Sequence, residues 1–225
     1  MSTHTDTITE NGTAGPDLAE PAPSVASSPP STAFFAGNPA AVGIPLFIAG
    51  SVALALVLVG YVPATAVGAS IPIIFAATGI GLTLSTIWSA ALGQTAVASI
   101  FGIFAGFWLS YAVLVLGLTH NWFAITAAAA VHTQGLFLIT WLVIVGMLTI
   151  STLRLPLAFT VLFVLVDVCL AIVLAATING SSSLSKVGGV VAFVFAAVGV
   201  YLYVGIAGEA TGGKGVPLGR PIIVS

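Results

Sequence analysis

The stretch from Leu155 to Ile178 reads LPLAFTVLFVLVDVCLAIVLAATI, and it contains a single charged side chain, that of Asp167. The hydrocarbon core of a bilayer is about 30 Å thick, and a helix needs about 20 predominantly apolar residues to cross it. Leu155–Ile178 has this length and this composition. The stretch therefore predicts a transmembrane helix, and similar stretches on either side would extend that prediction to the whole chain.

The overall composition supports this extension. The chain has 225 residues, of which 59% are hydrophobic and 4% are charged. Soluble domains carry about 25% charged residues, so this chain cannot cover a water-facing surface and its main solvent must be the lipid bilayer. The net charge of −2 gives no attraction for nucleic acid. Because Cys169 is the single cysteine, a disulfide within the chain is excluded.

Apolar runs recur along the chain and predict an all-α integral membrane protein, with six transmembrane helices in a compact bundle. We place these helices at 43–62, 67–91, 96–118, 134–153, 155–178 and 187–207. The breaks between them contain Pro, Gly, Asn or His, which are common in loops. The alanine-rich stretch 122–133 is too short to cross a bilayer, so we predict an interfacial or re-entrant piece there.

Composition also divides the chain into three parts. Residues 1–35 are predicted to be a disordered polar tail, because their Ser, Thr, Pro and acidic residues cannot bury enough apolar surface to fold. The first 33 residues contain neither Lys nor Arg, which does not fit a secretory signal. Residues 36–208 are the predicted transmembrane domain, and 209–225 are a short C-terminal tail.

Six spans place both termini on the same side of the membrane. If that side is the cytoplasm, the cytoplasmic segments hold Arg154, Lys214 and Arg220, and the opposite side holds Lys186. Cytoplasmic loops carry an excess of Lys and Arg. We therefore expect a multi-pass protein of the plasma membrane with both termini in the cytoplasm.

An Asn-Pro pair stands at the start of the first apolar segment. Asn38 is a favoured helix N-cap, and Pro39 suits the first helical position, where its missing N–H costs nothing. Pro45 cannot donate a hydrogen bond to the carbonyl of Ala41, so it loosens that turn. Gly43 permits close approach of another backbone. One interpretation is a simple cap at the membrane surface, and the other is an opened helix start that binds a small anion.

Asp167 lies at the middle of its predicted span. A charged Asp at the bilayer centre costs about 2.5–3.5 kcal/mol on insertion scales, so its side chain should be buried, paired or protonated. Two roles stay open. The carboxyl group takes up and releases a proton during transport, or it makes a structural hydrogen bond to a Ser or Thr of a neighbouring helix.

Catalytic motifs are not found in this sequence. It has no phosphate-binding loop, nucleophile elbow or zinc-protease helix motif. His120 and His132 have no third ligand at a suitable spacing, so we expect neither a metal site nor a cofactor. A helical bundle without an extramembrane catalytic module indicates transport and argues against an enzyme.

Four segments resemble the acetate uptake transporter family (AceTr), which includes the bacterial succinate–acetate permeases. They match, in order, the family's NPAPLGL signature, its GNTFG-to-FWLSY segment, its fourth helix ending in TLR, and its last helix with the following VLP-x-G. The four are AGNPAAVGIPLF (36–47), GQTAVASIFGIFAGFWLSYAVL (93–114), LFLITWLVIVGMLTISTLRLP (136–156) and YLYVGIAGEATGGKGVPLG (201–219). The chain departs from the family at several positions, including Val42 and Ile44 in place of leucines and an added Pro45, and it is a divergent member. Ala41 replaces the second proline, Gln94 replaces an asparagine, and Phe104 replaces a tyrosine.

The resemblance implies a six-helix protomer, a homo-oligomer of six copies, and movement of small monocarboxylates such as acetate or of succinate. In the family a Phe, a Tyr and a Leu form a narrow hydrophobic constriction, and these positions fall on Phe47, Phe104 and Val166. The Phe at 104 removes a hydroxyl, which implies a drier constriction. The alternative for each of these residues is ordinary core packing.

The function predicted from the sequence is transport of an acetate-like anion together with a proton. An anion entering against an inside-negative potential pays about 2.3 kcal/mol per 100 mV, and a co-transported proton removes that cost, which favours symport. The predicted pathway residues are Asn38, Pro39, Gly43, Phe47, Phe104 and Val166, with Asp167 for the proton. Two alternatives are a channel for another small solute such as ammonia, and a membrane scaffold or sensor that does not transport.

Overall fold

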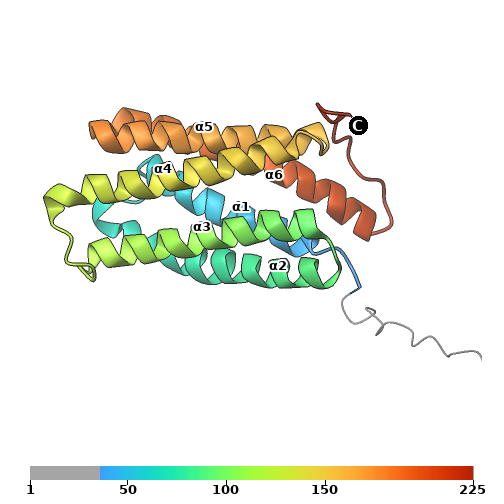
Figure 1. Ribbon diagram of the computed structural model, residues 1–225, viewed down its shortest axis with the longest axis horizontal. Coiled ribbons are helices and arrows are strands. Elements are labelled where there is room, and N and C mark those ends of the chain that lie inside the picture. Colours follow the sequence, from blue (N-terminus) through green and yellow to red (C-terminus); the bar gives the residue numbers. More distant parts are fainter. Residues whose placement is uncertain (1–35, 225) are drawn as a thin grey trace, which may run out of the picture. The chain divides into compact units, whose positions relative to one another are not determined.

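The computed structural model of this chain describes residues 36–224, and it is all-helical over that range (Figure 1). The predicted N-terminal tail, 1–35, lies outside the described residues. The helical elements are α1 (Ala40–Leu58), the 3₁₀-helix η2 (Ala64–Ser70), the π-helix η3 (Pro72–Ile80), α2 (Gly81–Ala91), α3 (Thr95–Thr119), α4 (Ala127–Thr152), α5 (Leu157–Asn179) and α6 (Ser182–Ala210).

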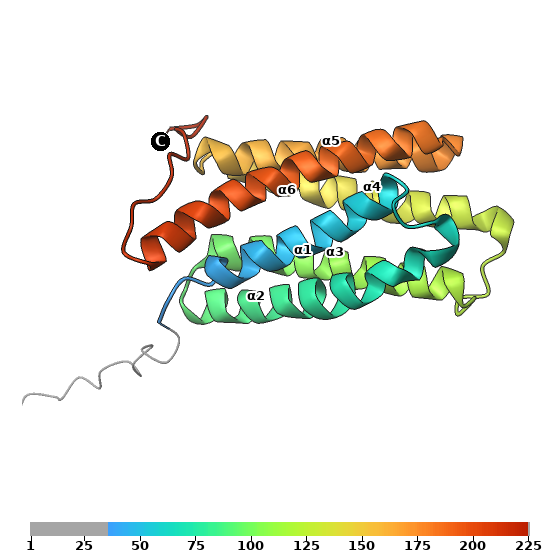
Figure 2. The same ribbon diagram turned by 180° about the vertical axis from the view of Figure 1, so that it is seen from behind.

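Six of these stretches are long and apolar enough to cross a membrane, which confirms the predicted fold class. The second stretch, Thr65–Ala91, combines most of η2 with η3 and α2. Helix α1 packs on α6, α6 on α5, α5 on α4, and α2 on α3. The helices run lengthwise beside one another, and the start of α1 lies at the same end of the bundle as the C-terminal segment (Figures 1 and 2). This placement is what six spans require.

Helices α4 and α6 begin well before the predicted starts at residues 134 and 187. Helix α4 starts at Ala127, so the prediction of an interfacial or re-entrant piece over 122–133 is wrong for residues 127–133. The Thr126 hydroxyl accepts a hydrogen bond from the Ala129 N–H at 3.3 Å, and the alanines that follow have the highest helix propensity. Helix α6 starts at Ser182, capped by Ser181, whose hydroxyl accepts from the Leu184 N–H at 3.3 Å.

Helix α1 crosses η3 at very close range. The Thr78 hydroxyl donates a hydrogen bond to the Leu46 carbonyl at 2.9 Å, and the Thr78 side chain is fully buried. Gly50 makes this approach possible, since a Cβ atom there would lie 2.8 Å from the Thr78 side chain. Small residues at such crossings allow helix backbones in membranes to approach each other closely.

We expect Gly50→Ala to destabilise the protein by about 1–3 kcal/mol, because the added methyl group overpacks this crossing. Gly146→Ala on α4 is the matched control, since a Cβ at Gly146 meets no atom within 4 Å. The control should be neutral or gain up to about 1 kcal/mol from helix propensity. Thermal unfolding of both variants in the same detergent measures the difference, and equal shifts would contradict the close crossing.

The C-terminal segment after α6 folds back over the turn between α4 and α5. The Leu153 carbonyl, at the end of α4, accepts hydrogen bonds from the Ile222 and Ile223 N–H groups at 3.1 and 3.0 Å. The Ala158 N–H, in the first turn of α5, donates to the Leu218 carbonyl at 2.9 Å. These bonds satisfy backbone groups at two helix ends, which have no partner within their own helices.

Truncation after Gly215 should therefore lower the free energy of unfolding. Three backbone hydrogen bonds are lost at about 0.5–1.5 kcal/mol each, a total of about 1.5–4.5 kcal/mol. Truncation after Ile223 keeps all three bonds and serves as the control. Thermal unfolding in detergent is the measurement, and an unchanged midpoint for the shorter chain would show that the segment adds nothing to stability.

Candidate functional site

The predicted helix start at Asn38-Pro39 is present. The side-chain oxygen of Asn38 accepts a hydrogen bond from the Ala40 N–H at 3.0 Å, and Pro39 already has helical backbone angles (φ −56°, ψ −27°). Pro39 is buried and Asn38 is exposed. Helix α1 continues through Pro45 without a break. The Asn38 side chain therefore serves as a cap, and Ala40 beside it faces an apolar cavity.

Gly43 gives this part of α1 its close contact with α3. A Cβ atom at Gly43 would lie 2.3 Å from the Phe101 ring, so a larger residue cannot stand there without moving that ring. Phe101 is itself buried and lines the same apolar cavity as Ala40. The packing role of Gly43 thus follows directly from the geometry.

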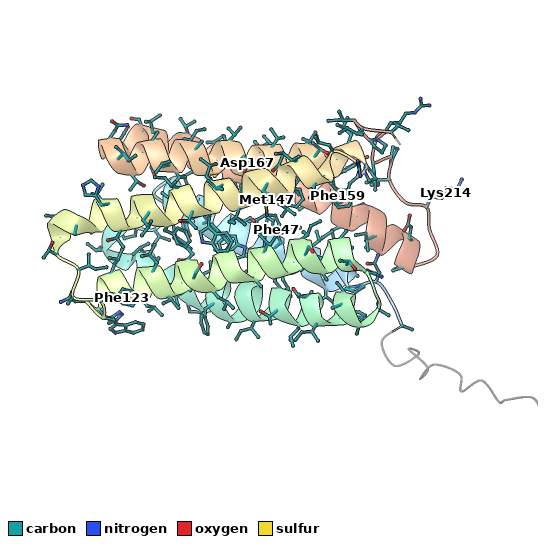
Figure 3. All side chains as sticks on the ribbon, in the orientation of Figure 1. Phe47, Phe123, Met147, Phe159, Asp167 and Lys214 are labelled. Atoms are coloured by element: carbon teal, nitrogen blue, oxygen red, sulfur yellow. The ribbon has the colours of Figure 1, made fainter. Side chains whose placement is uncertain are left out.

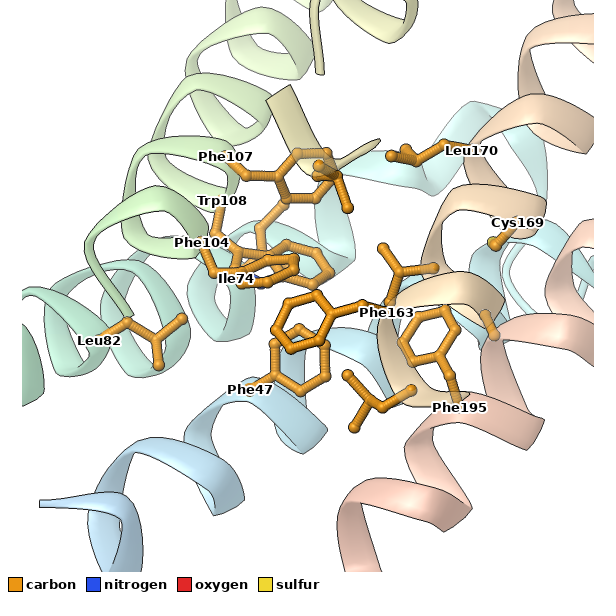
Figure 4. Packing of buried hydrophobic residues seen from close by; sticks show 14 of the residues in the cluster. Phe47, Ile74, Leu82, Phe104, Phe107, Trp108, Phe163, Cys169, Leu170 and Phe195 are labelled. Carbon is orange, nitrogen blue, oxygen red and sulfur yellow. The ribbon is translucent and has the colours of Figure 1, made fainter. Parts of the chain in front are cut away.

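Aromatic rings from α1, α3, α5 and α6 meet in the middle of the bundle (Figure 4). The Phe47 and Phe104 ring centroids are 4.9 Å apart, in an edge-to-face arrangement. Phe104 lies 5.6 Å from Phe163, and Phe47 lies 6.0 Å from Phe195. Each of the four side chains is at least 90% buried. We call these four residues the phenylalanine cluster.

The structure therefore brings two of the three predicted constriction residues, Phe47 and Phe104, into contact. The third, Val166, is buried on α5, but the α5 ring that packs on Phe104 is Phe163. Sequence reasoning missed Phe163 because the resemblance pointed to position 166. The sequence could have indicated Phe163, because Phe163 and Val166 are three residues apart and residues three apart on a helix share a face.

A cavity of about 100 Å³ lies beside the phenylalanine cluster, on the side of the α1 start. All of its lining residues are apolar, and they come from α1, α3, α5 and α6: Ala40, Ile44, Phe47, Val97, Ile100, Phe101, Phe104, Phe159, Leu162, Phe163 and Leu202. Such a wall offers no hydrogen-bonding side chain to a water molecule, which favours a dry cavity. We call it the apolar cavity.

Two cavities that polar side chains line in part lie at the opposite end of the bundle, with volumes of about 400 and 560 Å³. They share Gln134, Ser182 and Ser185 among their lining residues, so we treat them as one space, the polar vestibule. Tyr111 lines its deeper part and Lys186 its outer part. The phenylalanine cluster thus stands between a dry cavity at one end and a polar space at the other.

Aromatic contacts connect the vestibule to the cluster. Tyr111 stacks on Phe107, with ring centroids 6.2 Å apart and planes 14° apart. Phe107 in turn lies 6.5 Å from Phe104, edge to face. These rings come from successive turns of α3, which runs from the vestibule to the cluster.

Asp167 lies on α5 at its interface with α4 (Figure 3). One of its carboxyl oxygens is 2.6 Å from the Thr149 hydroxyl, so the predicted hydrogen bond to a Ser or Thr of a neighbouring helix is present. The same hydroxyl is 3.0 Å from the Val145 carbonyl. A protonated Asp167 satisfies both contacts at once, because it donates to Thr149 while Thr149 donates to Val145. Asp167 lines neither the apolar cavity nor the vestibule.

Comparison with known proteins places this fold among membrane proteins of one family. The model of the GPR1/FUN34/yaaH family matches residues 19–214. The curated relatives include the meiotically up-regulated gene 86 protein of Schizosaccharomyces pombe, which is 33% identical over 143 residues (59% of this chain and 45% of the relative). They also include acetate permease A of Emericella nidulans, which is 30% identical over 136 residues (58% and 46%).

Ammonia transport outward protein 2 of Saccharomyces cerevisiae is 28% identical over 136 residues, which is 57% of this chain and 47% of that protein. The chain thus spans about half the length of the curated relatives it matches. A solved structure, the bacterial acetate channel SatP, superposes with a TM-score of 0.72 at 23% identity. That match covers 82% of this chain and 99% of the channel, and it shows a shared fold.

Proposed function

Because the chain belongs to the GPR1/FUN34/yaaH family, we propose that it moves small monocarboxylates such as acetate across a membrane, together with a proton. The family consists of membrane transporters and channels, not enzymes. One relative bears the name of an acetate permease. The observation that carries the proposal is the apolar cavity beside the phenylalanine cluster.

The size of the apolar cavity suits an acetate-sized solute. Its volume is about 100 Å³, whereas a dry cavity of about 150 Å³ in another protein holds a benzene ring. A molecule of a few heavy atoms fits this space, and each CH₂ or methyl group that it buries there contributes about 0.8 kcal/mol. A short-chain acid has such a group, and it gains affinity that ammonia does not.

The dryness of the cavity supports proton co-transport. A bare carboxylate that leaves water for an apolar cavity loses its hydration with no compensating hydrogen bond, which is far more costly than moving the neutral acid. The neutral acid is the anion with one proton added. Passage of this form through the apolar cavity therefore moves one proton with each anion, without a separate proton-binding residue.

The phenylalanine cluster is the proposed constriction. Phe47, Phe104 and Phe163 close the inner end of the apolar cavity, with Val166 buried one turn further along α5. Phe104 has no hydroxyl that could hydrogen-bond a solute. The start of α1 at Asn38, Pro39 and Gly43 stands beside the outer part of this cavity, which supports a place for these residues on the pathway.

Location and assembly are proposed on other grounds. Many large apolar side chains on the bundle are exposed, among them Leu136, Val143, Met147 and Ile150 along α4. Such a surface requires lipid or further copies of the chain as its solvent. We propose a hexamer in the plasma membrane with both termini cytoplasmic, as the resemblance and the distribution of Lys and Arg suggest.

Uptake of radiolabelled acetate into liposomes tests the transport proposal. We expect uptake by the wild type to follow an imposed proton gradient and to exceed that of empty liposomes. Phe163→Leu should speed uptake roughly 2- to 12-fold, since it removes an aromatic pair worth about 0.5–1.5 kcal/mol from the constriction. Phe193→Leu, at a partly exposed position on α6, is the matched control and should leave the rate unchanged.

The other outcomes of this experiment decide between the alternatives. Uptake that ignores the gradient would indicate a channel for the anion. Ammonia flux without acetate flux would favour the activity named for the yeast relative. No flux of either solute from folded protein would overturn transport and favour a scaffold or sensor.

Asp167→Asn tests the proton-coupling role predicted for Asp167. The asparagine amide can donate to Thr149 as a protonated carboxyl group does, so we expect the fold to persist. If the neutral acid carries the proton, acetate uptake and its dependence on the gradient should stay within about twofold of the wild type. Loss of the gradient dependence, with the midpoint of unfolding unchanged, would instead assign the coupled proton to Asp167.

A further inference from the structure

The polar vestibule carries one positive charge and no negative charge. Lys186 is the single charged residue that lines it, among the residues that the structure describes. The other three cations are elsewhere: Lys214 and Arg220 lie in the C-terminal segment, and Arg154 lies in the turn between α4 and α5 (Figure 3). The two carboxylates within residues 36–224, Asp167 and Glu209, do not line the vestibule either.

Position as well as charge distinguishes Lys186. It stands in the first turns of α6, four residues after Ser182, and both residues line the outer part of the vestibule. Residues four apart share a helix face, so both side chains face the same space. Most of the remaining wall is apolar and has a low dielectric constant, which strengthens the field of a single charge within the space.

The deeper part of the vestibule offers hydrogen-bond donors to an anion that has entered. No hydrogen-bond partner for the Tyr111 hydroxyl is found within residues 36–224, and this side chain lines the vestibule. The Gln134 amide nitrogen makes one long contact of 3.4 Å with the Ala130 carbonyl. By contrast, Ser185 and Thr177 already donate to the carbonyls of Leu58 and Val173.

We infer that Lys186 makes the polar vestibule an anion-selective mouth, which admits small carboxylates and repels ammonium. This inference rests on the proposed transport function. Lys186 attracts the anion from solution, and the Tyr111 hydroxyl replaces part of its lost water at the base of the vestibule. The anion then meets the aromatic rings of α3 and passes the constriction as the neutral acid. Lys186 thus acts on substrate selection and on the rate of capture.

The electrostatic effect of Lys186 on the vestibule can be measured without a transport assay. We propose Ser182→Cys as a reporter, labelled in detergent with small thiol reagents of negative and of positive charge. The native Cys169 is buried, so the wild-type chain gives the background. With Lys186 present, the negative reagent should react faster. Lys186→Gln should lower the ratio of the two rates roughly tenfold, as expected for one unit charge several ångströms away in a medium between protein and water.

Lys214→Gln removes one charge at the opposite end of the bundle and is the matched control. It should leave the ratio unchanged. Lys186→Glu should invert the preference, so that the positive reagent reacts faster. A ratio that is the same with and without Lys186 would overturn the inference and would indicate that this side chain turns away to lipid headgroups.

The effect of Lys186 on acetate capture is measured with the same Lys186 variants in liposomes. Lys186→Gln should lower acetate uptake several-fold at low acetate concentration and low salt, and the deficit should shrink as salt screens the charge. Uptake at saturating acetate should change little, because capture is then no longer limiting. Equal uptake by both proteins at low acetate and low salt would overturn the inference. If the wild type moves no acetate, the proposed function fails. The ratio of the two labelling rates still tests whether Lys186 makes the vestibule selective for anions.

Discussion

The hydrogen-bonding needs of the backbone in a lipid environment govern this structure. No water is available in the bilayer core, so each N–H and C=O group must find a partner within the protein. Long helices meet this need along their length, but their ends do not. Here the hydroxyls of Thr126 and Ser181 accept hydrogen bonds from backbone N–H groups at the starts of α4 and α6. Backbone groups of the C-terminal segment likewise hydrogen-bond the Leu153 carbonyl and the Ala158 N–H. The segment predicted as a short C-terminal tail thus makes hydrogen bonds to the ends of α4 and α5.

The same constraint explains where polar atoms are placed within the bundle. Most Ser and Thr hydroxyls donate to carbonyls of their own helix, whereas the side chains of Thr78, Thr160, Asp167 and Ser185 join neighbouring helices. Tyr111 and Lys186 supply further polar groups at one end of the bundle. The other end leads into a dry cavity. A solute that crosses the phenylalanine cluster therefore changes environment, and a weak acid can do so at the lowest cost by changing its protonation state.

Much of the fold could be predicted from the sequence, since bilayer thickness sets the length of each span. The early starts of α4 and α6 could not be placed by hydropathy, because the first turns contain alanines or serines that a search for apolar runs passes over. The candidate site was predicted in part. Phe47 and Phe104 were identified through the family resemblance, but Phe163 was missed. The ring contact between Phe163 and Phe104 depends on how α5 packs against α3, which the sequence of α5 does not contain.

The sequence by itself determined that the chain is a six-span helical membrane protein, because composition and span length leave no other way to satisfy the backbone in lipid. It also marked Asp167 as an acid within a span that should be buried, paired or protonated. The tertiary structure alone decided that the partner is Thr149, that rings from four helices meet, and that Lys186 faces the polar vestibule. These features depend on how helices far apart in the sequence pack against one another, and side-chain packing between helices leaves no periodic signal in a single sequence.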